Sequence, residues 1–408
     1  MKKFFLFLII VIILGFLFFR FKKDRFSLLD GTIDNKVFVD KYFVYGNHLN
    51  IFGSFDIDSY DSLSLVFKSF DNEISYDLII DDNSFSTSKY INEGIFLDDL
   101  GIDDYFVFLK CVNGDQVSYY NLVNKTKYND LKYFALSNTK KVIDINYSSY
   151  SNKEYFDINV SGTDSTDYYD VVIDAGHGGD DPGASYASHN EADITLDYAL
   201  ALKKSLENLG LRVKLTRDSD VSIDSYGPHS RTGIVYESGA KYVFSIHLNS
   251  SDLKLKSGGV EIYSPSGASL DFAKSLAKNI VNSADTNYSN NESFRVLDGV
   301  YVRTFTKDDI NSSIASARKN GYTPYSIDSD TTYYYMIRET GGIATKAYID
   351  GRDKNYNKNV YFDSNIGAEG YLMELGFINY WGDLNNLVDN KSGYIDGITN
   401  AIKDEIGI

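Results

Sequence analysis

Residues 171–184 have the sequence VVIDAGHGGDDPGA, in which a short apolar run leads directly into a glycine-rich loop that carries a histidine. The run predicts a buried strand from Asp170 to Asp174. Apolar residues then recur at steps of three and four between Ala192 and Leu209, which predicts a helix with Gly210 as its C-terminal cap. A strand followed by a loop and a helix is the repeating unit of α/β domains, so this stretch decides the fold class.

The same alternation of strand-like and helical patterns continues to the C-terminus. We therefore expect a three-layer α/β domain over residues 169–408, in which a mostly parallel or mixed twisted sheet lies between helices. Further strands are expected at 211–216, 241–247, 260–263, 300–303, 333–337 and 369–374, and further helices at 228–238, 270–284 and 392–406.

The region before this domain has a different pattern. Residues 36–160 consist of short apolar runs with period two, separated by Asn, Asp and Gly at intervals of about 10–15 residues. This predicts an all-β, sandwich-like domain, joined to the α/β domain by a small polar linker at 161–168. The role of the β domain is open at this stage, because the pattern fits both a spacer and a binding module.

The N-terminus carries an uninterrupted apolar run. Residues 4–19 are sixteen consecutive apolar or glycine residues with lysines or arginines on both sides. A membrane-spanning helix needs about 17–25 residues, which this run reaches with its flanking basic side chains. A signal peptide would end in a small-residue cleavage site, which is absent here. We therefore expect a single-pass membrane anchor at 1–23 and a stalk at 24–35, while the flanking charges leave the orientation open.

The overall charge excludes one class of function. The chain has 57 acidic and 40 basic residues and a net charge of −17. A general nucleic-acid binder is therefore not expected, because a polyanion would be repelled. The only cysteine, Cys111, rules out an intrachain disulfide and a cysteine zinc cluster, and we expect it to be a small core residue.

Four side chains of the α/β domain have the chemistry of a metal site. His177, His247 and Glu374 fall at or just past the ends of predicted strands, where open α/β sheets bind ligands. Glu191 opens the first helix behind Asn190, a favourable N-cap residue, and the helix dipole stabilises its ionised form. Two imidazoles, one carboxylate and an open fourth position form a catalytic zinc set, and a second carboxylate can then act as general base.

From about Tyr169 to the C-terminus, the sequence resembles the zinc-dependent N-acetylmuramoyl-L-alanine amidases of the amidase-3 type, which cleave peptidoglycan. The resemblance implies that His177, Glu191 and His247 bind Zn²⁺ and that Glu374 is the general base. It also implies that the cleaved bond joins the lactyl group of N-acetylmuramic acid to the L-alanine of the stem peptide. The matching segments are IDAGHGGDDPGA (173–184), Glu191 with the helix after it, LTRDSD (215–220), Arg231, FSIHLNSS (244–251), GGVEIY (258–263) and YLMELGFINY (371–380).

The implied substrate extends the expectations to partners and location. A peptidoglycan substrate favours a single-pass protein of the cell membrane with its catalytic domain outside the cytoplasm, and the β domain is then a spacer or a wall- or partner-binding module. Candidate substrate-binding or supporting residues are Arg231, Asn249, Arg338 and Arg352. The long segment 264–373 either builds a substrate groove, which we favour, or holds an inhibitory helix that an activating protein partner removes.

Two other functions are compatible with the same residues. The chain could be a non-catalytic wall-binding or regulatory protein on an amidase scaffold, although all four site positions are filled. It could also be a zinc peptidase that cuts within the stem peptide, because the four site residues alone do not choose between the two bonds.

Overall fold

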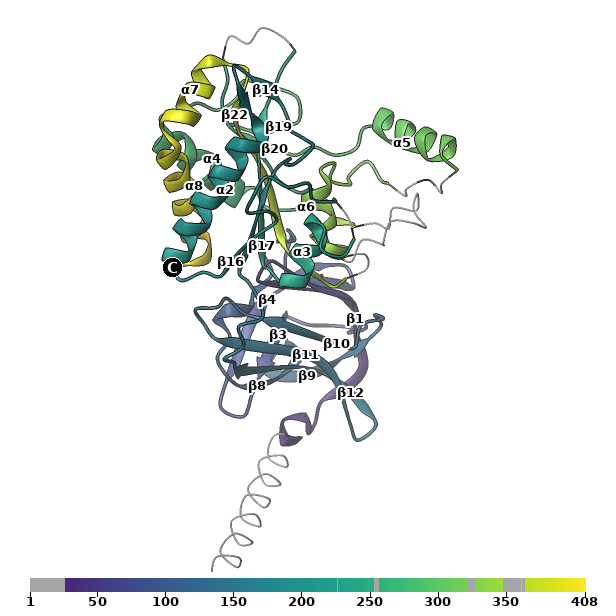
Figure 1. Cartoon of the computed structure of the whole chain (residues 1–408). Helices are drawn as coiled ribbons and strands as arrows, with labels where there is room; N and C mark the ends of the chain where they lie inside the picture. Colours follow the sequence, from purple (N-terminus) through teal and green to yellow (C-terminus); the bar gives the residue numbers. More distant parts are fainter. Residues whose placement is uncertain are drawn as a thin grey trace, which may run out of the picture.

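The computed structural model describes residues 26–225, 227–252, 257–321, 324, 327–347, 361 and 364–408. Figure 1 shows a β-rich part, formed mainly by residues 33–162, against one end of an α/β part that begins at Val171. The expected membrane anchor at 1–23 lies outside the described residues. Within the ranges given above, no helix is long and apolar enough to cross a membrane.

The α/β part is built on a mixed seven-stranded sheet with the order β16-β13-β17-β22-β18-β20-β19. β13 pairs in parallel with β16 and β17, β17 pairs in parallel with β22, and β18 is antiparallel to β22. This confirms the expected α/β class. The strand bounds are β13 Val171–Ala175, β16 Val213–Leu215, β17 Tyr242–Asn249, β18 Glu261–Tyr263, β19 Arg295–Leu297, β20 Val300–Tyr301 and β22 Glu369–Phe377.

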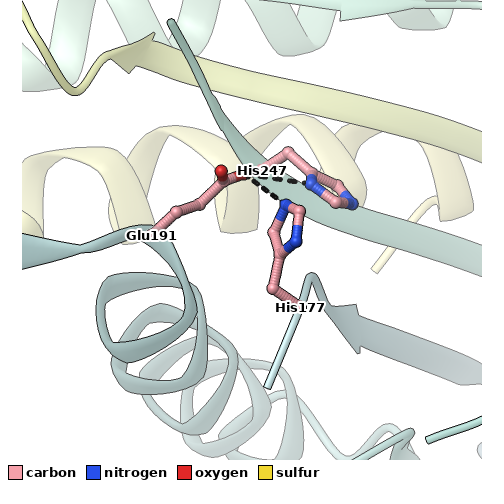
Figure 2. Close-up of side chains that lie close together, drawn as sticks. All are labelled: His177, Glu191 and His247. Atoms are coloured by element: carbon pink, nitrogen blue, oxygen red, sulfur yellow. Dashed lines mark hydrogen bonds and ion pairs between the residues drawn. The ribbon is translucent and has the colours of Figure 1, made fainter. Parts of the chain in front are cut away.

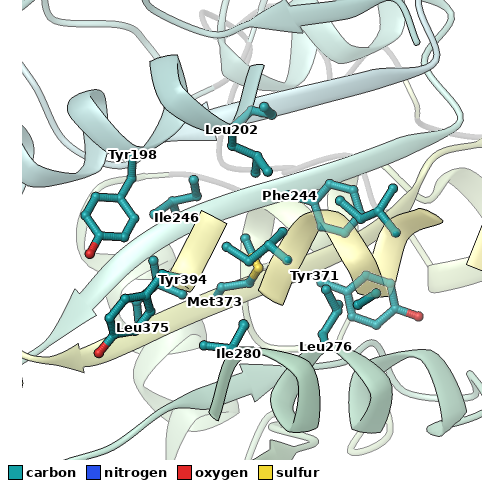
Figure 3. Packing of buried hydrophobic residues seen from close by; sticks show 14 of the residues in the cluster. Tyr198, Leu202, Phe244, Ile246, Leu276, Ile280, Tyr371, Met373, Leu375 and Tyr394 are labelled. Atoms are coloured by element: carbon teal, nitrogen blue, oxygen red, sulfur yellow. The ribbon is translucent and has the colours of Figure 1, made fainter. Parts of the chain in front are cut away.

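Helices cover both faces of this sheet because successive strand residues point to opposite sides. Val171 and Ile173 belong to the main apolar core, whereas Val172 packs on the other face with Val235 and Met336. Figure 3 shows the main core, where aromatic and aliphatic side chains of the central strands meet those of the helices. The helices are α2 Glu191–Asn208, α3 Arg231–Ser238, α4 Asp271–Ala284, α5 Lys307–Lys319, α6 Tyr335–Glu339, α7 Trp381–Asp389 and α8 Lys391–Ile406.

One predicted strand is wrong. Residues 333–337 were expected to be extended, but the helix α6 occupies 335–339. A short apolar run such as this does not distinguish a buried helical turn from a strand by periodicity alone. Packing against the sheet selects the helix here. Met336 and Ile337 are both buried, in separate clusters on the sheet, and the Thr340 hydroxyl donates to the Met336 carbonyl oxygen at 2.6 Å.

The N-terminal part is β-rich, as expected, and Cys111 is buried in its strand β8. Its strands form one connected sheet in which β1 pairs antiparallel with β2 and parallel with β9, and side chains from most strands meet in one apolar core. The strand bounds are β1 Ile33–Tyr45, β2 His48–Phe55, β3 Ser62–Lys68, β4 Glu73–Asp77, β5 Ile79–Asp81, β6 Ser84–Ser86, β7 Ile95–Phe96, β8 Asp104–Asn113, β9 Gln116–Asn124, β10 Asp130–Phe134, β11 Lys141–Tyr150 and β12 Lys153–Gly162.

The two parts are joined through backbone and buried side chains. The short strand β21 (Ile366–Gly367) of the α/β part pairs in parallel with the end of β1. Nearby, the Asn92 side chain donates to Glu369 at 3.0 Å, and the Tyr242 hydroxyl donates to Asn47 at 3.1 Å. All of these contacts lie at the N-terminal ends of the parallel strands, so the C-terminal ends of the same strands are left free for a site.

Candidate metal centre

Three of the predicted site residues converge at the C-terminal ends of the central strands. His177 follows β13, His247 lies near the end of β17, and Glu191 is the first residue of α2. Their ligand atoms lie within 4.8 Å of one another, and Figure 2 shows all three side chains pointing toward a common space. The Glu191 Oε1 atom lies 3.1 Å from both the His177 Nε2 atom and the His247 Nδ1 atom.

This donor set fits a zinc ion. Metal bonds of about 2.0–2.2 Å in a tetrahedral site separate the ligand atoms by roughly 3.3 Å, close to the observed 3.1 Å. The two imidazoles are partly exposed, with 24% and 22% of their side-chain surface accessible, whereas Glu191 is buried. A small molecule can therefore approach the histidine side of the site, as a catalytic metal with an open position requires.

The loop that carries His177 depends on glycine for close packing. His177 itself has a positive φ of 61°, an uncommon conformation for a residue with a side chain. A Cβ atom at Gly176 would lie 2.4 Å from the His247 Cε1 atom. One at Gly183, where φ is +65°, would lie 2.7 Å from the Glu191 Oε2 atom. The glycines thus let the loop bring the first histidine against the other two ligands.

Two buried arginines hold the backbone of this loop. The Arg231 guanidinium pairs with Asp174 at 2.6 Å and donates to the carbonyl oxygens of Ala175 and His177. The Arg217 guanidinium donates to the carbonyl oxygens of Ala175 and Gly176 from the other side. Breaking the hydrogen bonds of a buried guanidinium would lower the stability of the fold by several kcal/mol. These two arginines therefore fix the backbone that carries His177.

The charges at the site favour an ionised carboxylate. Burial alone would raise the pKa of Glu191, but hydrogen bonds with His177 and His247 outweigh it, and the pKa lies well below its ordinary value. The hydrogen bond with Glu191 raises the pKa of His177, against the opposing effect of burial. A metal ligand must be a carboxylate rather than a carboxylic acid, so the depressed pKa of Glu191 suits that role.

Glu374 lies beside the three ligands but is not one of them. In the sheet register it is the neighbour of His247 on one side and of Glu261 on the other. Its Oε2 atom is buried and has no hydrogen-bond partner among the described residues. Burial raises the pKa of Glu374 well above its ordinary value, and the carboxylates of Glu191 and Glu261 raise it further. A carboxyl group placed beside a possible metal site is the kind of side chain that serves as a general acid or base.

Comparison with known proteins agrees with this geometry. Residues 171–404 match the family model described as N-acetylmuramoyl-L-alanine amidase, which is more than half of the chain. The chain belongs to this family.

The curated relatives are similar over shorter segments. The sporulation-specific N-acetylmuramoyl-L-alanine amidase of Bacillus subtilis (strain 168) is 40% identical over 82 residues, which is 20% of this chain and 31% of that protein. The amidase AmiA of Escherichia coli (strain K12) is 35% identical over 110 residues, 26% of this chain and 37% of that protein. The matches thus span about a third of the length of these relatives.

Solved structures of amidases align with part of the chain. The catalytic domain of CwlV from Bacillus (Paenibacillus) polymyxa var. colistinus aligns at 20% identity with a TM-score of 0.38, covering 59% of this chain and 99% of that one. The CwlD amidase of Clostridioides difficile, solved in complex with the GerS lipoprotein, aligns at 22% identity with a TM-score of 0.37, covering 59% of this chain and 98% of that one.

The other predicted site residues of this amidase-family domain lie in different surroundings. Arg231 holds the His177 loop, as described above. Asn249 ends β17 just beyond His247, and its side chain accepts from the Ser250 backbone at 3.0 Å. Arg338 is buried in α6, where it pairs with Glu339 at 2.7 Å and donates to two carbonyl oxygens; a contact with substrate stays a prediction. Arg352 lies outside the described residues.

Sequence reasoning missed three residues that surround the centre. Asp181 lies 2.8 Å from the His177 Nδ1 atom, where a carboxylate orients the ring and determines which nitrogen is left for a metal. Arg217 holds the loop backbone, and Glu261 is the buried neighbour of Glu374. All three lie within the family-like segments quoted from the sequence. His177 and Asp181 are only four residues apart, so their contact could have been considered from the sequence. The contacts of Arg217 and Glu261 depend on how the strands pair in the sheet.

The N-terminus of α2 differs in one detail from the expectation. Asn190 is the N-cap residue, but its side chain accepts no hydrogen bond from the helix backbone. Instead, its Nδ2 atom donates to Asp193 at 3.2 Å, and its Oδ1 atom accepts from Ser185 at 2.9 Å. Asn190 therefore ties the preceding hairpin to the helix, which places Glu191.

Proposed function

We propose that this chain is a zinc-dependent N-acetylmuramoyl-L-alanine amidase. It hydrolyses the amide bond between the lactyl group of N-acetylmuramic acid and the L-alanine of the stem peptide. The observation that carries the proposal is the convergence of His177, Glu191 and His247 within 4.8 Å, beside Glu374 with its buried Oε2 atom, in a chain of this family. The three ligands leave the fourth position of a tetrahedral site for water or substrate.

A zinc ion at this site would supply Lewis acidity, which lowers the pKa of a bound water toward about 7 and polarises the substrate carbonyl. The chain supplies the proton transfers. Glu374 takes a proton from the attacking water and returns it to the nitrogen of the departing L-alanine. Its place in the sheet supports both steps, because Glu374 is the register neighbour of the ligand His247.

Other residues keep this geometry fixed. Asp181 can accept a hydrogen bond from the Nδ1 atom of His177, which would leave the Nε2 atom of that ring to hold a metal. Arg231 and Arg217 hold the loop backbone behind the ring. Orienting groups of this kind reduce the rearrangement needed when the transition state forms.

The proposal extends to the location and the remaining parts of the chain. We propose that residues 1–23 anchor the protein in the cell membrane as a single span and that the catalytic domain lies outside the cytoplasm. The support is the apolar run at 4–19 together with the substrate class. The β-rich part packs on the sheet end opposite the metal centre, so it can act as a spacer without covering the site.

Segment 264–373 was expected to form either a groove or an inhibitory cover. Its helix α5 extends away from the α/β part in Figure 1, and Ala317 is the only residue of α5 that is buried. This arrangement favours a site that is open in the described part of the chain. An activating protein partner stays a prediction.

The test is product analysis with purified peptidoglycan. The chain should release peptides that begin with L-alanine and carry no muramic acid, leaving glycan strands with free lactyl groups. A chelator should abolish release and zinc should restore it. New reducing sugar ends would contradict the proposal, as would new ends within the stem peptide, which would favour the zinc-peptidase alternative. Binding to peptidoglycan without any release would favour a non-catalytic wall protein.

A further inference from the structure

An aromatic pair of an exposed tryptophan and a partly buried tyrosine lies at the C-terminal end of the sheet, on segments that lead directly from the proposed metal ligands. Trp381 and Tyr186 contact each other with ring centroids 5.4 Å apart and an angle of 66° between the ring planes. Trp381 is 55% exposed, more than any other large apolar side chain in the described part of the α/β domain. We call this pair the aromatic corner. The proton-transfer chemistry of the site does not use it.

The Tyr186 side of the aromatic corner is tied to a metal ligand through a short hairpin. Tyr186 lies on β14 (Ser185–Tyr186), which pairs antiparallel with β15 (His189–Asn190). Glu191 follows β15 directly as the first residue of α2. The position of the Tyr186 ring is therefore coupled to that of the ligand carboxylate.

The Trp381 side is tied to the segments that carry Glu374 and His247. Trp381 opens α7, a few residues after Glu374 at the end of β22. Between the two, the Ile378 backbone donates to the Asn249 carbonyl oxygen at 2.9 Å, and the Asn379 side chain donates to the Ser251 carbonyl oxygen at 2.6 Å. These two hydrogen bonds join the start of α7 to the residues that follow His247.

The helix that carries Trp381 is held firmly. Two residues further along α7, the buried Asp383 carboxylate accepts hydrogen bonds from the backbone of Gly259 at 2.8 Å and of Phe377 at 2.7 Å. At the far end of α7, the Leu387 carbonyl oxygen accepts from the Tyr198 hydroxyl at 2.7 Å. The helix is thus fixed to both β22 and α2. An aromatic side chain held in this way loses little conformational entropy when a ligand packs on it.

We infer that the aromatic corner binds a sugar ring of the glycan strand beside the muramic acid whose amide is cleaved. This inference rests on the proposed function. A pyranose ring presents a face of C–H groups, which packs on the negative face of an aromatic ring and removes apolar surface from water. Because the two aromatic rings lie at a steep angle, one sugar ring can pack on the face of the first and contact the second from the side. N-acetylhexosamines are neutral, so the acidic net charge of the chain does not repel them.

The position of the corner assigns it to a neighbouring sugar rather than to the reacting group. β22 continues for three residues past Glu374 before the chain turns into α7. At about 3.3 Å per residue, this places the end of the strand roughly 10 Å beyond Glu374. The muramic acid that carries the scissile amide must lie at the metal, so a group farther along the glycan strand reaches Trp381.

The first test uses intrinsic fluorescence, because Trp381 is the only tryptophan of the chain. The full chain is titrated with a soluble N-acetylglucosamine oligomer, with a synthetic stem peptide and with neutral lipid vesicles. We expect a saturable change of tryptophan emission with the oligomer alone. No change with the oligomer would overturn the inference, and so would a change with only the peptide or only the vesicles. This readout does not require catalysis, so it stands apart from the proposed function.

The second test measures kinetics on two substrates, a muramoyl peptide with a single sugar and the same peptide on a longer glycan. Trp381→Ala should raise KM about tenfold on the longer substrate, leave its kcat unchanged and have no effect on the single-sugar substrate, because stacking on an aromatic ring contributes on the order of 1 kcal/mol. Trp381→Tyr should restore most of the loss. Val388→Ala is the matched control, since Val388 is 49% exposed on the same helix.

Two outcomes of the kinetic test would contradict the inference. One is an unchanged KM of Trp381→Ala on the longer substrate, and the other is an equal rise of KM on both substrates. Failure of the wild-type chain to cleave either substrate would instead contradict the proposed function.

Discussion

The two ends of strand β22 carry two glutamates whose surroundings differ. Glu369 lies at the N-terminal end, against the β-rich part, where its Oε1 atom accepts from Asn92 at 3.0 Å and from the Tyr371 hydroxyl at 2.6 Å. Glu374 lies at the C-terminal end, where the carboxylates of Glu191 and Glu261 act on it. Both side chains have a buried Oε2 atom without a hydrogen-bond partner in the described part of the chain, and burial raises the pKa of both.

This comparison shows that burial and a raised pKa do not by themselves mark a catalytic acid. Glu369 faces neutral donors that hold two parts of the chain together, so its protonated form is part of a structural contact. Glu374 is the register neighbour of His247, which belongs to the cluster that could bind a metal, and we propose that it exchanges a proton with the substrate there. Substitutions at the two ends of the strand should therefore separate activity from stability.

The largest expected effect is on turnover at the C-terminal end. Glu374→Gln removes the proton acceptor while keeping the shape of the side chain. We expect kcat to fall by about 10²–10⁴-fold, the usual contribution of general acid–base catalysis. The free energy of unfolding should not fall, because the buried Oε2 atom has no hydrogen bond to lose. Turnover on purified peptidoglycan and a denaturant titration measure the two quantities. A variant with full turnover would remove Glu374 from the mechanism.

A smaller effect is expected from the residue that orients the first ligand. Asp181→Asn keeps a hydrogen-bond acceptor near His177 but removes the carboxylate charge. Zinc affinity should decrease by about 10–100-fold, as is typical when an outer partner of a ligand histidine is changed. Competition with a chromophoric chelator measures the affinity. Asp180→Asn is the control, because Asp180 is the exposed neighbour of Asp181. Equal affinities in the two variants would show that Asp181 does not support the metal.

At the N-terminal end, the effect should be on stability alone. Asn92→Ala removes the donor to Glu369 and leaves the Ser269 backbone amide, which donates to the Asn92 Oδ1 atom at 2.7 Å, without its partner. We expect the free energy of unfolding to fall by about 1–3 kcal/mol, with kcat unchanged. Asn83→Ala, at an exposed position of the same β-rich part, should change neither quantity. A loss of turnover in Asn92→Ala without loss of stability would contradict the separation of the two ends.

The last prediction concerns how the contribution of Glu369 to the free energy of unfolding changes with pH. Burial raises the pKa of Glu369 to about 8, whereas the same group in the unfolded chain ionises near its ordinary value of 4.5. Between these values the folded chain holds one more proton than the unfolded chain. The contribution of Glu369 is therefore fully present below pH 4.5 and is lost as the pH rises toward about 8, by roughly 1.4 kcal/mol per pH unit.

Glu369→Gln should abolish this dependence, since glutamine resembles the protonated acid and does not ionise. The two proteins should have similar free energies of unfolding near pH 5, and the variant should be the more stable one near pH 8. Denaturant titrations at both values of pH measure the difference. An equal change in the free energy of unfolding between the two values of pH in both proteins would mean that Glu369 is ionised in the folded chain.

The sequence was most informative where local pattern and chemistry coincide. The strand before His177 was predicted from its apolar run in front of a glycine-rich loop, and the helix after Glu191 was predicted from its apolar periodicity. Strand ends in an α/β sheet then bring such residues together. Segment 333–337 could not be assigned correctly, because its short apolar run suits a strand and a helical turn equally well. Only packing on the sheet makes it the helix α6.

Contacts between distant segments could not be predicted from the sequence. Asn92 and Glu369 are 277 residues apart, and neither belongs to a pattern that points to the other. The same holds for Tyr186 and Trp381, which meet only because β14 and α7 lie at the same side of the sheet. Glu261 was visible as an acid in an apolar run, but its position opposite Glu374 depends on the antiparallel register of β18.

The most direct test of the account is the zinc content of two matched variants, Glu191→Gln and Glu374→Gln, purified as the full chain and measured by elemental analysis. Both changes replace a carboxyl group near the two histidines by an amide, but only Glu191 belongs to the described cluster that could hold an ion. We predict that Glu191→Gln loses the metal and that Glu374→Gln keeps one ion per chain. Loss of zinc from Glu374→Gln, or full retention in Glu191→Gln, would contradict the assignment of ligand and base.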